Sequence, residues 1–131
     1  MGMVSLVLLS HSPKIVEGAR DLAIQMGGEA NIITVGGTKA GTLGADYDKT
    51  YAAMKEAAEQ GEVVVLADIG SARLTGQMAQ EALDEELRKR VFLCDAAIVE
   101  GALIAAIAIS AGQTAKETLD QLQEYLLPKN E

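Results

Sequence analysis

The sequence predicts an α/β protein with an open, mostly parallel sheet that is flanked by helices on both faces. Short aliphatic runs alternate along the chain with longer segments of helical periodicity, which is the pattern of repeated β-α units. The short runs are almost continuously apolar, as expected for parallel strands that helices cover on both sides. Hydrophobic residues make up 49% of the chain but aromatic residues only 3%, so the core is expected to consist of Ala, Val, Ile, Leu and Met.

Each predicted element corresponds to a distinct segment. Strands are predicted at residues 4–9, 29–35, 62–67 and 90–94, and all four are expected to be buried. Helices are predicted at residues 12–27, 46–61, 71–90, 100–111 and 114–126. The sequence contains no internal repeat or low-complexity linker, so residues 1–131 are interpreted as a single domain.

The first predicted helix has the clearest limits. Ser12 is a favourable N-cap, Pro13 suits the first turn, and Gly27-Gly28 follows the last turn. The apolar side chains at helical spacing, which are expected to face the core, are Ile15, Ala19, Leu22, Ala23 and Met26.

The charge and the cysteine content exclude several classes of function. The chain has 19 acidic and 11 basic side chains and a formal net charge of −8, which is unfavourable for binding nucleic acid or anionic membranes. Cys94 is the single cysteine, so neither an intrachain disulfide nor a thiolate zinc cluster is possible. No metal is expected, and a reducing cytoplasm is the expected location.

Two apolar segments are interpreted as core elements. The N-terminal run MVSLVLL lacks the basic region and the cleavage site of a signal peptide. The later segment AAIVEGALIAAIAISAG is interrupted by Glu100 and Gly101, which leaves fewer than the ~20 residues that a bilayer span requires. Glu100 could belong to a site, a helix start or a subunit contact, and the structural role ranks first.

Polar residues follow two of the predicted strands at the points where these strands end. Right-handed crossovers predict the strand order 2-1-3-4 when the first helix carries the chain to one side and later connections carry it to the other. The direction then reverses between strands one and three, where open α/β sheets usually bind ligands. Strand one ends in Ser10-His11-Ser12, and strand three is followed by Asp68, Gly70 and Ser71. We therefore expect an imidazole and a carboxylate to meet at this edge.

The chemistry of these side chains is complementary. A carboxylate that accepts a hydrogen bond from one nitrogen of His11 fixes the tautomer and leaves the other nitrogen as a nucleophile. Asp68 would also stabilise the positive ring that forms during attack. Ser12, Gly70 and Ser71 stand at predicted helix starts, whose unpaired N–H groups favour a phosphate or another anion. Phosphoryl transfer depends mainly on positioning and electrostatics, so these residues could suffice for a phosphohistidine.

A glycine-rich segment, VGGTKAGTLGAD at residues 35–46, follows the second strand and is predicted to be a loop at the same edge. It lacks the Lys-Ser/Thr ending of a nucleotide-binding P-loop, and the chain has no G-x-S-x-G elbow. Structural explanations stay open for each feature: His11 as a capping or surface residue, Asp68 as an acceptor in a plain turn, and the glycine segment as a flexible connection. Their joint occurrence favours a functional site.

Four motifs in order along the chain, SHSPKIVEG, GGTKAGTLGAD, DIGSA and AAIVEGALIAA, resemble those of the DhaM family. These proteins are phosphotransferase-system subunits of bacterial dihydroxyacetone kinases, and their domain has the mannose-type EIIA fold. The resemblance runs nearly end to end.

The resemblance implies a homodimer in which His11 accepts a phosphoryl group from the carrier HPr. The group would then pass to ADP, held with Mg on the DhaL subunit, and the ATP formed would phosphorylate dihydroxyacetone bound by DhaK. Asp68 matches the carboxylate that orients the ring, and Ser71 matches a nearby helix-start donor. The residues implied to border the pocket are Gly36, Gly37, Thr38, Gly41 and Thr42. No permanently bound cofactor is implied, only a transient phosphohistidine.

Two rival functions remain. A sugar-transporting mannose-type EIIA would pass its phosphoryl group to an EIIB protein, although its usual third-strand motif is closer to Gly-Gly-Ser-Pro than to DIGSA. A non-catalytic regulatory or anion-binding module of the same architecture would bind partners without transferring phosphate.

Overall fold

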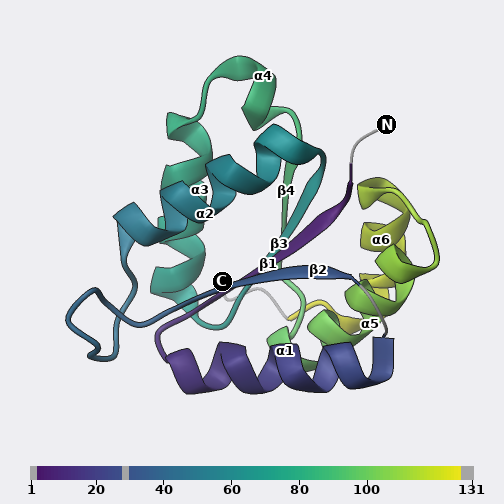
Figure 1. Cartoon of the computed structure of the whole chain (residues 1–131), viewed down its shortest axis with the longest axis horizontal. Coiled ribbons are helices and arrows are strands. Elements are labelled where there is room, and N and C mark those ends of the chain that lie inside the picture. The colour runs from purple at the N-terminus through teal and green to yellow at the C-terminus, as the bar shows by residue number, and fades with distance from the viewer. Residues whose placement is uncertain (1–2, 28–29, 128–131) are drawn as a thin grey trace.

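The computed structural model describes residues 3–27 and 30–127 (Figure 1). In this part of the chain, four strands form one parallel sheet in the order β2-β1-β3-β4. The predicted α/β fold class and the predicted strand order are therefore confirmed.

The strands lie close to their predicted positions. They are β1 (Ser5–Ser10), β2 (Asn31–Gly36), β3 (Val63–Ala67) and β4 (Val91–Cys94). Residue 29, the predicted start of the second strand, lies outside the described residues. Every residue of the central strand β1 is buried, whereas β2 and β4 are partly exposed. The expectation that all four strands are buried is wrong for these two, because an edge strand has a neighbouring strand on one side only.

Helices cover both faces of the sheet (Figure 1). One face carries α1 (Pro13–Gly27), α5 (Ile98–Ser110) and α6 (Ala115–Gln121), and the other carries α2 (Tyr47–Gln60) and α3 (Gly70–Ala82). Successive side chains of β1 alternate between these two layers: Leu6 and Leu8 pack toward α1 and α5, whereas Val7 and Leu9 pack toward α2 and α3. Small residues allow close packing of the helices, since a Cβ at Gly27 would lie 2.9 Å from the Cβ of Ala106 in α5.

The buried face of α1 differs from the predicted one. Ala19 and Ala23 are buried, but Val16 takes the third position on this face. Ile15, Leu22 and Met26, which were expected to face the core, are exposed. The small side chains of the buried face let α1 approach both the sheet and α5, and larger side chains would hold them apart. Gly28, part of the predicted helix end, lies outside the described residues.

The predicted helix at residues 71–90 is two helices in the structure. α3 ends at Ala82, and the short α4 (Glu85–Arg88) begins after Asp84, whose side chain accepts a hydrogen bond from the Leu87 N–H at 3.1 Å. Leu83 between them is extended and only 2% exposed. Burial of Leu83 and capping by Asp84 together stabilise the break.

The last two predicted helices also have different limits. α5 begins at Ile98, before the predicted residue 100, and Glu100 lies in its first turn, where a negative charge is favourable. The predicted helix at residues 114–126 is α6 followed by a short 3-10 helix (Gln123–Tyr125), with Thr114 and Glu117 forming a capping box. No helix within the described residues combines the length and the apolar character that a membrane span requires.

Gly36, the last residue of β2, lies against the start of α1. A Cβ at this position would lie 2.6 Å from the Cα of Pro13 and 2.8 Å from the backbone oxygen of Ser12. We expect Gly36→Ala to lower the free energy of unfolding by about 1–3 kcal/mol, because backbone atoms have to move apart. Urea denaturation measures this change.

Gly18→Ala is the matched control. Gly18 lies within α1 and a Cβ there would have no neighbour within 4 Å, so this change is expected to raise stability by about 0.5–1 kcal/mol. A Gly36→Ala variant as stable as the parent protein would contradict the close-contact argument.

Candidate active site

The carboxyl ends of β1 and β3 bring His11 and Asp68 together. The two strands are neighbours in register, with Leu9 opposite Ala67, and the Asp68 N–H donates to the backbone oxygen of Leu9 at 3.0 Å. From this edge β1 leads into α1 on one side of the sheet, and β3 leads into α3 on the other. The two side chains, 57 positions apart in sequence, therefore meet at the point where the strand order reverses.

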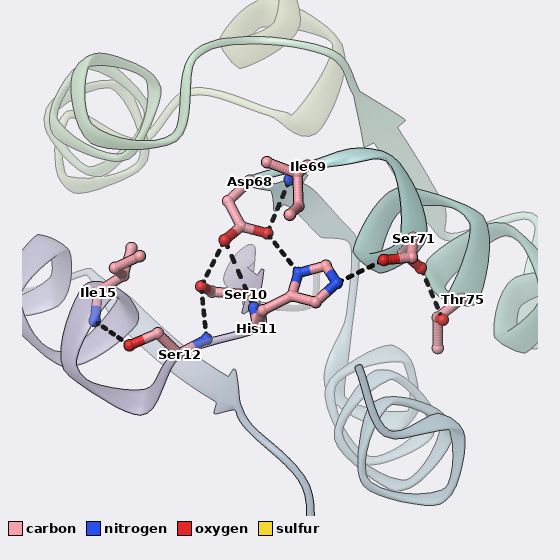
Figure 2. Close-up of polar contacts among 8 residues, drawn as sticks. All are labelled: Ser10, His11, Ser12, Ile15, Asp68, Ile69, Ser71 and Thr75. Carbon is pink, nitrogen blue, oxygen red and sulfur yellow. Dashed lines mark hydrogen bonds and ion pairs between the residues drawn. The ribbon is translucent and has the colours of Figure 1, made fainter. Parts of the chain in front are cut away.

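The imidazole of His11 lies between Asp68 and Ser71 (Figure 2). Its Nδ1 is 3.4 Å from Oδ1 of Asp68, and its Nε2 forms a short hydrogen bond with the hydroxyl of Ser71. The side chains of His11 and Asp68 are 21% and 11% exposed, so the ring is held by the protein but still reaches solvent.

This geometry selects one tautomer of the neutral ring. An ionised carboxylate only accepts hydrogen bonds, so Nδ1 of His11 carries the proton and faces Asp68. Nε2 then holds the lone pair and accepts the hydrogen bond that the Ser71 hydroxyl donates. The Nδ1–Oδ1 distance of 3.4 Å is longer than the usual range of about 2.7–3.2 Å. In this tautomer, the lone pair that is available for attack is the one on Nε2.

Two further groups hold the Asp68 carboxylate. The Ile69 N–H donates to Oδ1 at 2.7 Å, and the hydroxyl of Ser10 donates to Oδ2 at 2.6 Å. The backbone N–H of His11 also points to Oδ2, at 3.4 Å. No role for Ser10 is predicted from the sequence. The one sequence feature that points to it is its position, since this serine ends the apolar run of β1 directly before the histidine.

The first turn of α3 faces the imidazole from the other side. Ile69 occupies the N-cap position and provides no side-chain cap, so the first N–H groups of the helix are open to a ligand. The space beside Gly70 is also open, because a Cβ at this position would have no neighbour within 4 Å. Gly70 and Ser71 thus lie at a helix start that favours negative charge, as the sequence predicts, and the Ser71 hydroxyl contacts Nε2.

Ser12 lies on the other side of the site and is engaged in capping α1. Its hydroxyl accepts a hydrogen bond from the Ile15 N–H at 3.4 Å, and its own N–H donates to the Ser10 hydroxyl at 3.0 Å. Both groups are thereby directed toward the backbone and Ser10 rather than toward the ring of His11 (Figure 2).

The glycine loop contacts the backbone around His11. The Gly44 N–H donates to the His11 oxygen at 2.9 Å, and the Gly37 N–H donates to the Ser10 oxygen at 3.2 Å. Gly37 has a φ of 75° and its Cβ position is blocked by the Thr42 oxygen at 2.9 Å, so this turn requires glycine.

The other predicted loop residues bond to one another. The hydroxyls of Thr38 and Thr42 are 2.7 Å apart, and the Gly41 N–H donates to the Thr38 oxygen at 3.0 Å. Lys49 of α2 reaches the backbone oxygens of Gly36 and Gly37 at 3.2 and 3.3 Å. The loop is therefore placed at the site through its backbone.

An ion pair and a thiol also lie near the carboxyl edge of the sheet. Arg73 in the second turn of α3 pairs with Asp95, which follows β4. Burial raises the pKa of the Cys94 thiol, so this side chain is protonated and weakly nucleophilic at neutral pH. Within residues 3–27 and 30–127, no three side chains of the types that bind metals come together.

Comparison with known proteins gives consistent matches over nearly the whole chain. The family model EIIA-man, described as "PTS system fructose IIA component", matches residues 5–120. A phosphoryl donor subunit DhaM of PEP-dependent dihydroxyacetone kinase 2 from Listeria innocua is 36% identical over 92% of this chain and 97% of its own length. The DhaM phosphoryl donor subunit from Providencia stuartii is 33% identical over 98% of this chain.

The relatives differ in length. This chain spans 28% of the Providencia stuartii protein, in contrast to 97% of the Listeria innocua protein. A crystal structure of the protein EF1359, described as of unknown function, superposes with a TM-score of 0.86 and 32% identity over 98% of this chain and 99% of that chain.

Proposed function

Because this chain belongs to the EIIA-man family of the phosphotransferase system, we propose that it is the phosphoryl donor subunit of a PEP-dependent dihydroxyacetone kinase and that His11 carries the phosphoryl group. One observation supports this proposal above the others: the imidazole is held between a carboxylate at Nδ1 and a helix start at Nε2. A capping or surface histidine would not need a partner at both nitrogens.

In the first transfer, the Nε2 lone pair attacks the phosphorus of the group carried by HPr. The bond from phosphorus to Nε2 forms as its bond to HPr breaks, and the ring becomes positively charged while Nδ1 keeps its proton. Asp68, 3.4 Å from Nδ1, stabilises this charge. The Ser71 hydroxyl turns from Nε2 to a phosphoryl oxygen, and the open N–H groups at the start of α3 stabilise the negative charge.

In the second transfer, a terminal phosphate oxygen of ADP on the DhaL subunit attacks the same phosphorus. The bond to Nε2 breaks, the electron pair returns to the ring and ATP is formed. No proton has to enter or leave His11, because Nδ1 stays protonated throughout. Mg and ADP belong to the partner subunit, and this chain contributes the phosphohistidine only transiently.

Two partners have to reach His11 in turn, and the surroundings of the site suit this use. Ile69, the neighbour of Asp68, is 59% exposed, and Leu43 in the glycine loop is 75% exposed. Exposed apolar side chains beside a reactive group are typical of a docking surface. The net charge of −8 would accelerate encounters with partners that carry a basic surface.

A sugar-transporting EIIA is the second candidate, because the description of the matched family names a fructose IIA component. In that case the phosphoryl group of His11 would pass to an EIIB protein instead of ADP. Both functions use the same first transfer and differ only in the acceptor.

The decisive experiment follows the intact mass of the protein during incubation with phosphoenolpyruvate, enzyme I and HPr. We expect the gain of one acid-labile phosphoryl group, its absence in His11→Ala, and its loss when ADP-loaded DhaL is added. A label that an EIIB protein discharges and DhaL does not would identify the transport function. Failure to label the folded protein would contradict both.

Asp68→Asn tests the orienting carboxylate. We expect phosphorylation by HPr to slow by roughly 10- to 100-fold, since a hydrogen bond to a charged group contributes about 1.5–3 kcal/mol. Quenched-flow kinetics measure the rate of phosphorylation, and thermal unfolding shows whether the variant is folded. Asp48→Asn, at a surface aspartate that pairs with Lys39, is the control with no expected change. Equal rates for both variants would refute the orienting role.

Self-association is part of the proposal. The alanines of α5 are buried within one copy, but α1 exposes Ile15, Leu22 and Met26 at spacings that place them along one stripe. Exposed apolar stripes of this kind favour contact with a second chain. We expect sedimentation at micromolar concentration to give the mass of a homodimer, and a monomer under these conditions would contradict this expectation.

A further inference from the structure

We propose that Ser10 is a positioning residue of the phosphohistidine site, which acts by holding the Asp68 carboxylate in the orientation that keeps Nδ1 of His11 protonated. This inference rests on the proposed function, because it concerns how Nε2 of His11 is kept ready for attack. Neither the sequence motifs nor the comparisons assign Ser10 a role.

The contacts of Ser10 connect three parts of the site (Figure 2). Its hydroxyl is 2.6 Å from Oδ2 of Asp68 and 3.0 Å from the backbone nitrogen of Ser12. The residue is 3% exposed, so water does not replace either contact. The hydroxyl thereby links the end of β1, the start of α1 and the carboxylate that follows β3.

The direction of both hydrogen bonds follows from the chemistry of the groups. A backbone N–H can only donate, so the Ser10 oxygen accepts from Ser12. The hydroxyl has one proton, and the carboxylate only accepts, so this proton points to Oδ2 of Asp68. The N–H of Ser12 polarises the hydroxyl and strengthens its bond to the carboxylate.

This bond decides which carboxylate oxygen faces the imidazole. With Oδ2 bound by Ser10 and Oδ1 bound by the Ile69 N–H, rotation of the carboxylate would break two short hydrogen bonds. Oδ1 stays directed at Nδ1 of His11, and the tautomer with a free Nε2 is favoured. Without the Ser10 hydroxyl, the hydrogen bond to Oδ2 that remains among the described residues is the long one from the His11 N–H at 3.4 Å.

The other buried polar side chains of the described part of the chain differ from Ser10 in this respect. Ser5, at the opposite end of β1 and 0% exposed, accepts a hydrogen bond from the neutral amide of Asn31. Thr50 and Thr118 donate to helix carbonyls at 2.8 Å each. Ser10 alone among these four places its hydroxyl on an ionisable side chain of the site.

The test uses the fact that His11 is the single histidine of the chain. Proton–nitrogen correlation spectra of the ring therefore report its tautomer without overlap, and they require no phosphoryl transfer. We expect the Nδ1–H form in the parent protein and a several-fold rise of the Nε2–H form in Ser10→Ala. The rate of phosphorylation by HPr is expected to fall several-fold in the same variant.

Ser5→Ala is the matched control, because it removes a hydroxyl of similar burial from the same strand. It is expected to lower the free energy of unfolding and to leave the tautomer unchanged. A parent-like tautomer in Ser10→Ala, or an equal change in Ser5→Ala, would overturn the proposal.

A second pair of variants covers the case in which Ser10→Ala does not fold. Ser10→Thr keeps the hydroxyl, and Ser10→Val gives a side chain of nearly the same shape as threonine but without the hydroxyl. The Thr variant is expected to retain the parent tautomer and the Val variant to lose it, and identical spectra would refute the role of the hydroxyl. The spectra also distinguish failure of this inference from failure of the proposed function. If HPr does not label the protein but the tautomer of His11 still depends on Ser10, the proposed function is contradicted and this inference is not.

Discussion

The carboxylate of Asp68 is the group on which the arrangement of the site depends. It follows β3, accepts hydrogen bonds from Ser10 and Ile69, and faces Nδ1 of His11. These donors come from β1 and from the entry to α3, so the position of the carboxylate is set by the pairing of two strands and the start of one helix. The imidazole is thus oriented by regular elements, which position a site more precisely than loops do.

Close packing of small residues supports this arrangement. Gly36 and Gly37 let the end of β2 lie directly against Pro13, and the N–H groups of Gly37 and Gly44 bind backbone oxygens of Ser10 and His11. The segment that carries the histidine is therefore held by β3 on one side and by the glycine loop on the other. This accounts for glycines at the loop without assigning them a chemical role, and it leaves the ring itself accessible.

The proposed function places a nucleophile and an anion-binding helix start within an acidic protein, and these features are compatible for a simple reason. The overall charge of −8 acts over long distances and is weakened by salt, whereas the N–H groups at the start of α3 would act at contact distance on the phosphoryl group of the proposed phosphohistidine. In the proposed function, the first effect would favour encounters with basic partners and the second would stabilise the transferred group. Under the proposed function, the chemistry of phosphoryl transfer would need little else from this chain, since the acceptor nucleotide would arrive with its own subunit.

Much of the fold follows from local sequence. Apolar runs bounded by glycine and polar residues predict the strands, Ser12-Pro13 predicts the start of α1, and the handedness of β-α-β crossovers predicts the order 2-1-3-4. The meeting of His11 and Asp68 could be predicted because parallel strands end at one edge. Other features arise only in the tertiary structure, namely which face of α1 is buried and the break at Leu83. The link from Ser10 to Asp68 belongs to this second group, because a hydrogen bond across 58 positions depends on strand register and burial, which no local pattern encodes.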